Sequence, residues 1–358
     1  MARDFTDAVE GCLLGGAIGD AFGAPVENWH HADITAQYGA LTDFLPQPAR
    51  SRDGAPGQVT DDSTLRHYLS LAIVERGGRI LPEDYAHIWL TVLNPDRLYV
   101  TERIVLEKLR LGMNPWDTGR GQMPADAASM AIQPVGIINA GDPRQAYQDA
   151  VALAGIHQDG LERDAAATIA AGVAAAVVPG ATMDEVLDTM AAYATFDVAR
   201  LVTRARELGR RSGGDLQALY EGFYAELLDP TFPTFPGVEW DSQRSVAATS
   251  REVVPAVVAI LTAVPDDAAA AFSGAAGLGR DADSITTVVG TIIGAVHGAS
   301  ALPPQLVAQV EEANRDFFAE ATGDPSQGFT AMAHRLVGAV AQQRETVRAR
   351  LAFLDELV

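Results

Sequence analysis

Apolar residues recur along most of this chain at the spacing expected of amphipathic α-helices. The pattern starts with Phe5, Val9, Leu13 and Ile18 and is repeated many times toward the C-terminus. The later segments that share it are Leu65–Ile73, Ile104–Leu111, Ala165–Val178, Glu185–Tyr193, Leu201–Leu208, Leu216–Leu227, Val253–Val264, Leu306–Phe317 and Met332–Leu354. Strand-like alternation of apolar and polar residues is scarce, so the sequence predicts an all-α fold.

One segment, Ser284–Leu302, carries no formal charge and approaches the length of a membrane-spanning helix. Small and hydroxyl-bearing residues dilute its hydrophobicity, and Asp281 and Asp283 stand at its entrance. We therefore expect a helix buried in the protein core rather than a membrane span. Glycines recur within it every four residues, at Gly290, Gly294 and Gly298. On one helical face, such glycines let another backbone approach closely.

The composition limits the classes of partner. The chain has 358 residues, of which 48% are hydrophobic, so a large buried core is expected. It carries 47 acidic and 26 basic residues, a formal net charge of −21, which disfavours nucleic acid and membrane surfaces. Cys12 is the single cysteine, which excludes an intrachain disulfide and a thiolate metal cluster. The N-terminal sequence lacks the features of a secretory signal, so we expect a cytoplasmic protein.

The organisation of the chain favours one domain. Its loops rich in proline and glycine, such as Asp229–Val238, do not resemble interdomain linkers, because similar helical segments resume on both sides. The sequence has no evident internal repeat or low-complexity tract. We therefore expect a single domain over residues 1–358.

Three short segments rich in carboxylates, hydroxyls and glycines stand out from this helical background. They are GDAFGAPVE at Gly19–Glu27, TDDST at Thr60–Thr64 and GRDADS at Gly279–Ser284. Helix capping explains each acidic segment taken alone, because Asp62 or Asp283 can accept hydrogen bonds from the first N–H groups of a helix. Capping, however, uses only one carboxylate of each acidic pair.

A divalent cation accounts for the paired carboxylates. Asp61 lies next to Asp62, and one residue separates Asp281 from Asp283. Like charges a few ångströms apart raise one another's pKa, and a bound cation removes that conflict. The segments offer oxygen ligands and contain no histidine or cysteine, which favours Mg²⁺, Mn²⁺ or Ca²⁺ over Zn²⁺. Spacing along the sequence does not show that the segments meet in space.

The three segments, with the third extended to GRDADSITTVVGTIIGAVHG, resemble the ADP-ribosylglycohydrolase family, which includes the dinitrogenase reductase-activating glycohydrolases. Two weaker segments also fit, AASMAIQPVGI at Ala127–Ile137 and GIHQDG at Gly155–Gly160. The five segments occur in the order of the family over about residues 8–300. The resemblance implies an all-α orthogonal helical bundle and a magnesium-dependent hydrolase that cleaves N-ribosyl bonds.

The resemblance also implies roles for individual residues. The implied ligands of two Mg²⁺ ions, with Mn²⁺ as the alternative, are Thr60, Asp61, Asp62, Asp281, Asp283 and Ser284. The implied catalytic residues are Glu27 and Asp283. The implied contacts to the ribose and its substituent are Ser129, Met130 and His157. The ions would hold the ribose hydroxyls and orient water or Glu27 toward the anomeric carbon.

The chain departs from the family pattern at two places. Ser284 replaces the usual threonine of the second acidic motif, which keeps the oxygen ligand and loses a methyl group. The stretch Ala125–Ala131 reads ADAASMA, where ADP-ribose-cleaving members more often have Gly-Asn-Gly-Ala-Ala-Met-Arg. The alanines narrow a site where backbone must approach a ligand, and Ala131 stands where the arginine would be.

Three functions stay open at this point. The first is a hydrolase that removes ADP-ribose from a protein or small acceptor, and the resemblance favours it. The second uses the same metal site on a smaller N-riboside, and the altered Ala125–Ala131 loop favours it. The third is a catalytically silent binding homologue, which the intact acidic motifs and Glu27 argue against.

Overall fold

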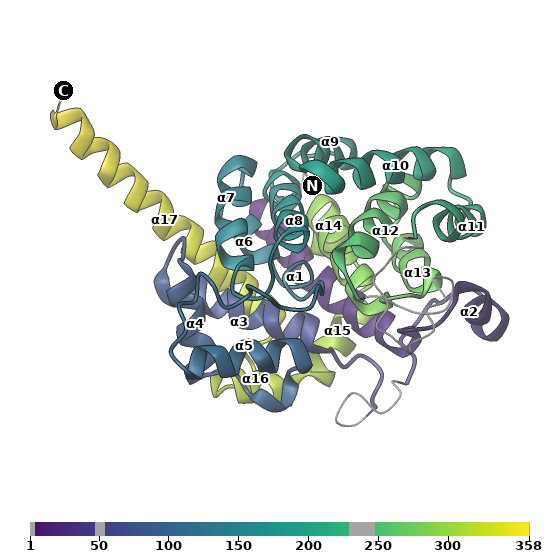
Figure 1. The fold of residues 1–358 in the computed structure, drawn as a ribbon, viewed down its shortest axis with the longest axis horizontal. Coiled ribbons are helices and arrows are strands. Elements are labelled where there is room, and N and C mark those ends of the chain that lie inside the picture. Colours follow the sequence, from purple (N-terminus) through teal and green to yellow (C-terminus); the bar gives the residue numbers. More distant parts are fainter. Residues whose placement is uncertain (1–3, 47–53, 229–247, 358) are drawn as a thin grey trace.

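The computed structural model describes residues 4–46, 54–228 and 248–357. Within these ranges the secondary structure is helical (Figure 1), and the only extended feature is an isolated antiparallel bridge between His30 and Gly279. The all-α prediction is therefore confirmed. None of the helices in these ranges is long and apolar enough to cross a membrane. The loop expected at Asp229–Val238 lies outside the described residues.

Two buried helices, α1 (Phe5–Gly23) and α14 (Ala282–His297), pack against each other at the centre of the fold (Figure 1). Their backbones touch at glycines, because a Cβ atom added to Gly15 would lie only 2.2 Å from the carbonyl oxygen of Gly290. The glycine face predicted for this segment is thus present in α14. Gly298 is the exception, since it follows the helix as its C-cap with a φ of +85°.

Helices from both halves of the chain surround this central pair. Those that contact α14 directly include α8 (Leu161–Ala176), α12 (Ser250–Ala263) and α13 (Ala268–Leu278). The other α-helices of the described chain are α2 (His31–Tyr38), α3 (Asp61–Arg76), α4 (Pro82–Thr91), α5 (Val100–Arg110), α6 (Gln133–Ile138), α7 (Pro143–Ala154), α9 (Met183–Tyr193), α10 (Phe196–Ser212), α11 (Leu216–Glu226), α15 (Pro304–Ala313), α16 (Arg315–Thr322) and α17 (Phe329–Leu357). Short 3₁₀ turns are η1 (Ala24–Val26), η2 (Pro95–Arg97) and η3 (Ala299–Ala301).

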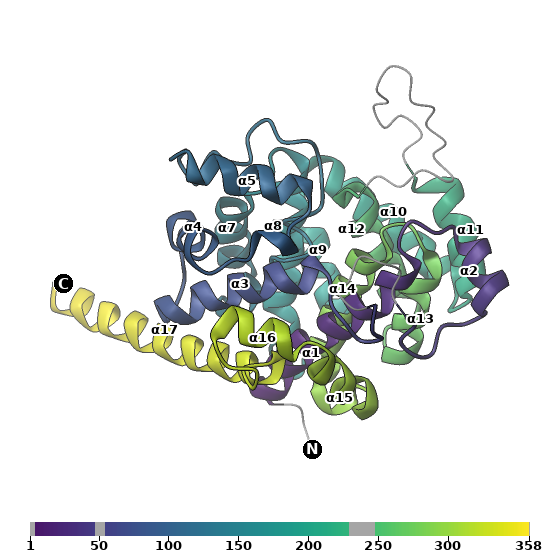
Figure 2. The ribbon, with the colours of Figure 1, turned by 90° about the horizontal axis from the view of Figure 1, so that it is seen from below.

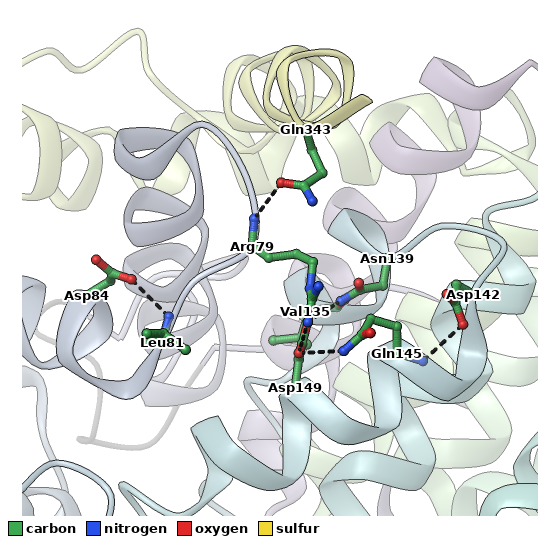
Figure 3. Close-up of polar contacts among 9 residues, drawn as sticks. All are labelled: Arg79, Leu81, Asp84, Val135, Asn139, Asp142, Gln145, Asp149 and Gln343. Atoms are coloured by element: carbon green, nitrogen blue, oxygen red, sulfur yellow. Dashed lines mark hydrogen bonds and ion pairs between the residues drawn. The ribbon is translucent and has the colours of Figure 1, made fainter. Parts of the chain in front are cut away.

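The last helix, α17, is packed at its start and projects away from the other helices at its end (Figures 1 and 2). Residues such as Leu336 are buried, whereas those from Arg344 onward are exposed. Figure 3 shows how Arg79, in the loop after α3, contacts Gln343 of α17 and Asp149 of α7. The Arg79 backbone N–H donates to Gln343 (3.3 Å), and the Arg79 guanidinium donates two hydrogen bonds of 2.6 Å to Asp149.

The structure corrects the predicted helix Leu306–Phe317, which is two helices separated at Asn314. The Asn314 side chain donates hydrogen bonds to the carbonyl oxygens of Gly57 (2.9 Å) and Val310 (2.7 Å). It also accepts one from the N–H of Val59 (3.1 Å). The helix ends here because the side-chain amide competes with helical backbone hydrogen bonds and ties this point to a distant loop.

The sequence predicts an apolar face of Ile104, Leu106, Leu109 and Leu111, and the structure buries only the middle two of these residues. Ile104 is 44% exposed and Leu111 is 83% exposed. Leu106 and Leu109 are buried as predicted, and Val105 is buried with them. The helix is present, but its buried face is rotated from the one that the apolar residues alone indicate.

Candidate active site

The three acidic segments meet at one pocket with a volume of about 260 Å³. Seven carboxylates line this pocket, those of Glu27, Asp61, Asp62, Glu102, Asp126, Asp281 and Asp283. The fold therefore brings together carboxylates that lie up to 256 positions apart, since the pocket is lined by both Glu27 and Asp283. Ser284 and Met130 also line it.

Asp20, in α1, holds the start of α3 in place. Its buried carboxylate accepts hydrogen bonds from the backbone N–H groups of Thr60 (3.0 Å) and Ser63 (3.0 Å). Thr60 is the N-cap of α3, and its hydroxyl accepts a hydrogen bond from the N–H of Asp62 (3.3 Å). Capping by Asp62 itself therefore does not occur, and the carboxylates of Asp61 and Asp62 face the pocket.

A short backbone pairing holds Glu27 beside the start of α14. The N–H of Asn28 donates to the carbonyl oxygen of Arg280 (2.7 Å), and the N–H of Arg280 donates to the carbonyl oxygen of Trp29 (2.9 Å). Asn28 and Arg280 have φ values of +67° and +64°, in a region that residues other than glycine rarely occupy. As a result, three carboxylates each place an oxygen within 4.8 Å of the others, those of Glu27, Asp281 and Asp283.

The Arg280 side chain is anchored in the core. Its guanidinium donates two hydrogen bonds to the carboxylate of Glu252, of 2.9 and 2.7 Å, and lies 5.6 Å from the ring centroid of Tyr224. The two charged side chains are only 1% and 5% exposed. Because Arg280 directly precedes Asp281, this ion pair fixes the direction in which α14 enters the site.

The carboxylates of the pocket are poorly satisfied by the protein alone. Burial, followed by the charges of neighbouring carboxylates, raises the pKa values of Asp61, Asp62, Asp281 and Asp283 well above the usual range of aspartate. Buried oxygens without a hydrogen-bond partner are found in Asp62, Asp126, Asp281 and Asp283. A hard divalent cation satisfies crowded oxygen ligands of this kind. The residues present therefore fit a Mg²⁺ or Mn²⁺ site.

The structure separates the three residues predicted to bind substrate. Met130 lines the pocket, and its sulfur lies 3.8 Å from the hydroxyl of Ser284. Ser129 is fully buried outside the lining and shares a 2.7 Å hydrogen bond with the hydroxyl of Ser250. His157 lines a different, small cavity. Burial lowers the pKa of His157 to about 4, so its imidazole is neutral at pH 7. Thus Met130 alone of the three faces the pocket.

Thr60 also differs from the other predicted metal ligands. It does not line the pocket, whereas the remaining five predicted ligands do. Its hydroxyl donates to the carboxylate of Asp62 at 3.3 Å. The structure therefore places Thr60 directly behind the acidic pair.

Three carboxylates near the pocket are absent from the predicted site, namely Asp20, Glu102 and Asp126. Asp20 has a signal in the sequence, since it is the only charged residue between Gly11 and Val26. Asp126 lies in the altered loop. The sequence shows that a carboxylate is present there, but not that its side chain points into the pocket. Glu102 occupies the first turn of α5, and no sequence pattern distinguishes it from a solvent-facing helical glutamate.

Comparison with known proteins relates the whole chain to one family. A sequence model described as ADP-ribosylglycohydrolase matches residues 1–346. The uncharacterised protein YegU of Escherichia coli (strain K12) is 27% identical over 332 residues, which cover 88% of this chain and 96% of YegU. An uncharacterised protein of Archaeoglobus fulgidus is 30% identical over 130 residues, which cover 36% of this chain and 41% of that protein.

A solved structure has a similar fold. It is described as an ADP-ribosylglycohydrolase-related protein complex and is 19% identical to this chain, with a TM-score of 0.68. The match covers 95% of this chain and 99% of the solved one, so the two share an all-α fold. The family match also includes every carboxylate that lines the pocket. The chain therefore belongs to the ADP-ribosylglycohydrolase family and has a glycohydrolase-type function.

Proposed function

We propose that this protein is a metal-dependent hydrolase that cleaves the N-glycosidic bond between a ribose and a nitrogen-containing group. The observation that carries the proposal is the convergence of seven carboxylates on one pocket, three of them with oxygens within 4.8 Å. Family membership supplies the reaction class. A catalytically silent binding protein is disfavoured, because buried carboxylates without partners destabilise the fold and such a protein does not require them.

The proposed metal ligands are those predicted from the sequence, with two ions held between α3 and α14. They are Thr60, Asp61, Asp62, Asp281, Asp283 and Ser284. When bound, Mg²⁺ or Mn²⁺ supplies positive charge for these oxygens and lowers the pKa of water. Of the six residues, only Thr60 does not line the pocket, and its hydroxyl donates a hydrogen bond to Asp62.

Glu27 is the residue best placed to accept a proton from the attacking water. Its carboxylate is partly exposed and shares the acidic group with Asp281 and Asp283. Cleavage of an N-ribosyl bond develops positive charge on the ribose, and carboxylates fixed around the sugar stabilise that charge. Asp283, at the first turn of α14, is held for this role by the buried anchoring of Arg280.

Two substrate classes fit this reaction. Family membership favours ADP-ribose attached to a protein side chain or to a small acceptor. The altered loop favours a smaller N-riboside, because Ala125, Asp126 and Ala127 all line the pocket. Two methyl groups and a carboxylate there reduce the room and the positive potential available to a diphosphate.

Incubation of the purified protein with candidate substrates tests the proposal. The substrates are ADP-ribosyl-arginine, ADP-ribosyl-serine and common N-ribosides, each with Mg²⁺ or with EDTA, and the products are measured by mass spectrometry. We expect metal-dependent release of ribose or ADP-ribose, reduced about 100-fold or more in Asp283→Asn. Asp316→Asn, on the exposed surface of α16, is the matched control and should retain activity. Failure to cleave any substrate, in protein that binds no metal, would contradict the proposal.

A further inference from the structure

The charge of the pocket limits the substrates that it can accept, provided that the proposed hydrolase function holds. Among the described residues, none that lines the pocket is a lysine, arginine or histidine. Two divalent cations would bring four positive charges to a pocket lined by seven carboxylates. If these carboxylates are ionised, the pocket stays negative after metal binding, and an anionic diphosphate is poorly matched to it.

One carboxylate, Glu102, lies outside the metal-binding group and still faces the pocket. It is only 2% exposed, and one of its oxygens accepts a hydrogen bond from the hydroxyl of Thr101 (2.8 Å). The other oxygen is buried and has no hydrogen-bond partner. Glu102 is not part of the group formed by Glu27, Asp281 and Asp283. A ligand that brings a donor into the pocket would satisfy this oxygen.

The neighbouring lining suits a flat, positively charged ring. Tyr99 is the N-cap residue of α5, the helix that carries Glu102, and Tyr99 lines the same pocket. Met123 and Pro124 add apolar surface to that lining. Aromatic faces attract cations, and thioether sulfur packs well against rings. Asp126 contributes a second buried oxygen without a partner, so this part of the pocket combines apolar surface with negative charge.

We propose that the substrate is an N-riboside with a cationic nitrogen base and no 5′-diphosphate, and that Glu102 recognises the cationic base. During cleavage, a water oxygen forms a bond to C1′ while the C1′–N bond breaks. The electron pair of that bond stays on the nitrogen and neutralises its charge, and the water proton passes to Glu27. A cationic base thus leaves as a neutral molecule and needs no general acid.

A series of pyridinium ribosides tests the substrate class. Nicotinamide riboside, its 5′-monophosphate and the dinucleotide NAD⁺ share the scissile bond and differ in the negative charge at the 5′ position. We expect kcat/KM in Mg²⁺ to fall about tenfold or more from the riboside to the dinucleotide, because like charges are brought together. An equal or higher kcat/KM for the dinucleotide would overturn the proposed substrate class.

The substitution Glu102→Gln tests the specificity residue. Its control is Glu107→Gln on the same helix, since Glu107 is 63% exposed. We expect Glu102→Gln to lower kcat/KM for nicotinamide riboside about tenfold or more, and to change that for the uncharged riboside inosine less than about threefold. The control should leave both values unchanged. An equal loss on both ribosides would give Glu102 a purely structural role and overturn this part of the proposal.

Calorimetric titration separates this inference from the hydrolase proposal. If no riboside or ADP-riboside is cleaved, the hydrolase proposal fails. Tighter binding of nicotinamide riboside than of NAD⁺, weakened by Glu102→Gln, would in that case still support the inference. Binding that is insensitive to both the diphosphate and the substitution would overturn it.

Discussion

The buried guanidinium of Arg280 forms a two-bond ion pair with the carboxylate of Glu252, at N–O distances of 2.9 and 2.7 Å. Arg280 has a left-handed backbone and directly precedes Asp281, so this pair positions the start of α14. Glu252→Gln leaves the guanidinium buried without its counter-charge. We expect it to lower the free energy of unfolding in urea by about 3–5 kcal/mol and to lower activity as Asp281 shifts.

A surface ion pair provides the control for this prediction. A guanidinium nitrogen of Arg110 lies 2.7 Å from a carboxylate oxygen of Glu107, and the two side chains are 49% and 63% exposed. Exposed pairs of this kind contribute little, so Glu107→Gln should change the free energy of unfolding by less than about 1 kcal/mol. If the two substitutions have similar effects, the ion pair in the core does not hold the site together.

Replacement of glycine by alanine should have opposite effects at Gly15, where α1 contacts α14, and at Gly338 in α17. A Cβ atom at Gly15 would lie 2.2 Å from the carbonyl oxygen of Gly290, so the two backbones must separate in Gly15→Ala. We expect a loss of about 3 kcal/mol in the free energy of unfolding. Gly338, in α17, has no atom within 4 Å of an added Cβ. There, Gly338→Ala should stabilise the protein by about 0.5–1 kcal/mol through helix propensity. Urea unfolding of both variants checks the prediction, and a stable Gly15→Ala protein would contradict the tight packing.

The fold was predictable from the sequence to the extent that it depends on periodicity. Amphipathic spacing predicts helices such as α1 and α3, because one face of each must be buried. It does not predict the break at Asn314, which depends on hydrogen bonds to a loop more than 250 residues away. The single domain expected over residues 1–358 stays a prediction. One continuous cluster of buried apolar residues, from Ala8 to Ala339, supports it.

The candidate site was predictable where the acidic residues themselves carry the signal. Paired carboxylates in the sequence are enough to indicate a cation, and Asp61 and Asp283 do line the pocket. Glu102 has no such signal, because only the packing of α5 turns its carboxylate away from solvent. His157 shows the opposite case, since resemblance assigns it to substrate and the structure places it in a separate cavity.

A buried histidine predicts how stability depends on pH. His67 packs against Phe317, Phe318 and Phe329, and neither of its ring nitrogens has a hydrogen-bond partner. Burial, followed by nearby arginine charges, lowers its pKa from 6.5 to about 3. Below pH 6.5 the unfolded chain therefore binds a proton that the folded protein does not. The contribution of His67 to stability is complete above pH 6.5 and is lost as the pH falls, by about 1.4 kcal/mol per pH unit.

The substitution His67→Leu removes this titration while keeping an apolar side chain of similar size in the cluster. We expect the urea-unfolding free energy of the variant to fall less steeply than that of the wild type between pH 6.5 and 4.5. The difference between the two slopes should approach about 1.4 kcal/mol per pH unit. Parallel curves would mean that His67 is protonated in the folded protein.

Removal of metal should reverse the order of thermal stability of the wild type and the Asp283→Asn variant. In EDTA the wild type must bury like charges around Asp283, whose pKa is raised by burial and by the charge of Glu27. Asp283→Asn removes one of these charges, so its Tm in EDTA should equal or exceed that of the wild type. Added Mg²⁺ at about 100 times its Kd should stabilise the wild type by about 2.7 kcal/mol. The variant lacks a ligand and should gain much less, so the wild type becomes the more stable protein. Differential scanning fluorimetry measures both Tm values, with Asp316→Asn expected to follow the wild type. If Mg²⁺ shifts neither Tm, or both equally, these carboxylates do not form a metal centre.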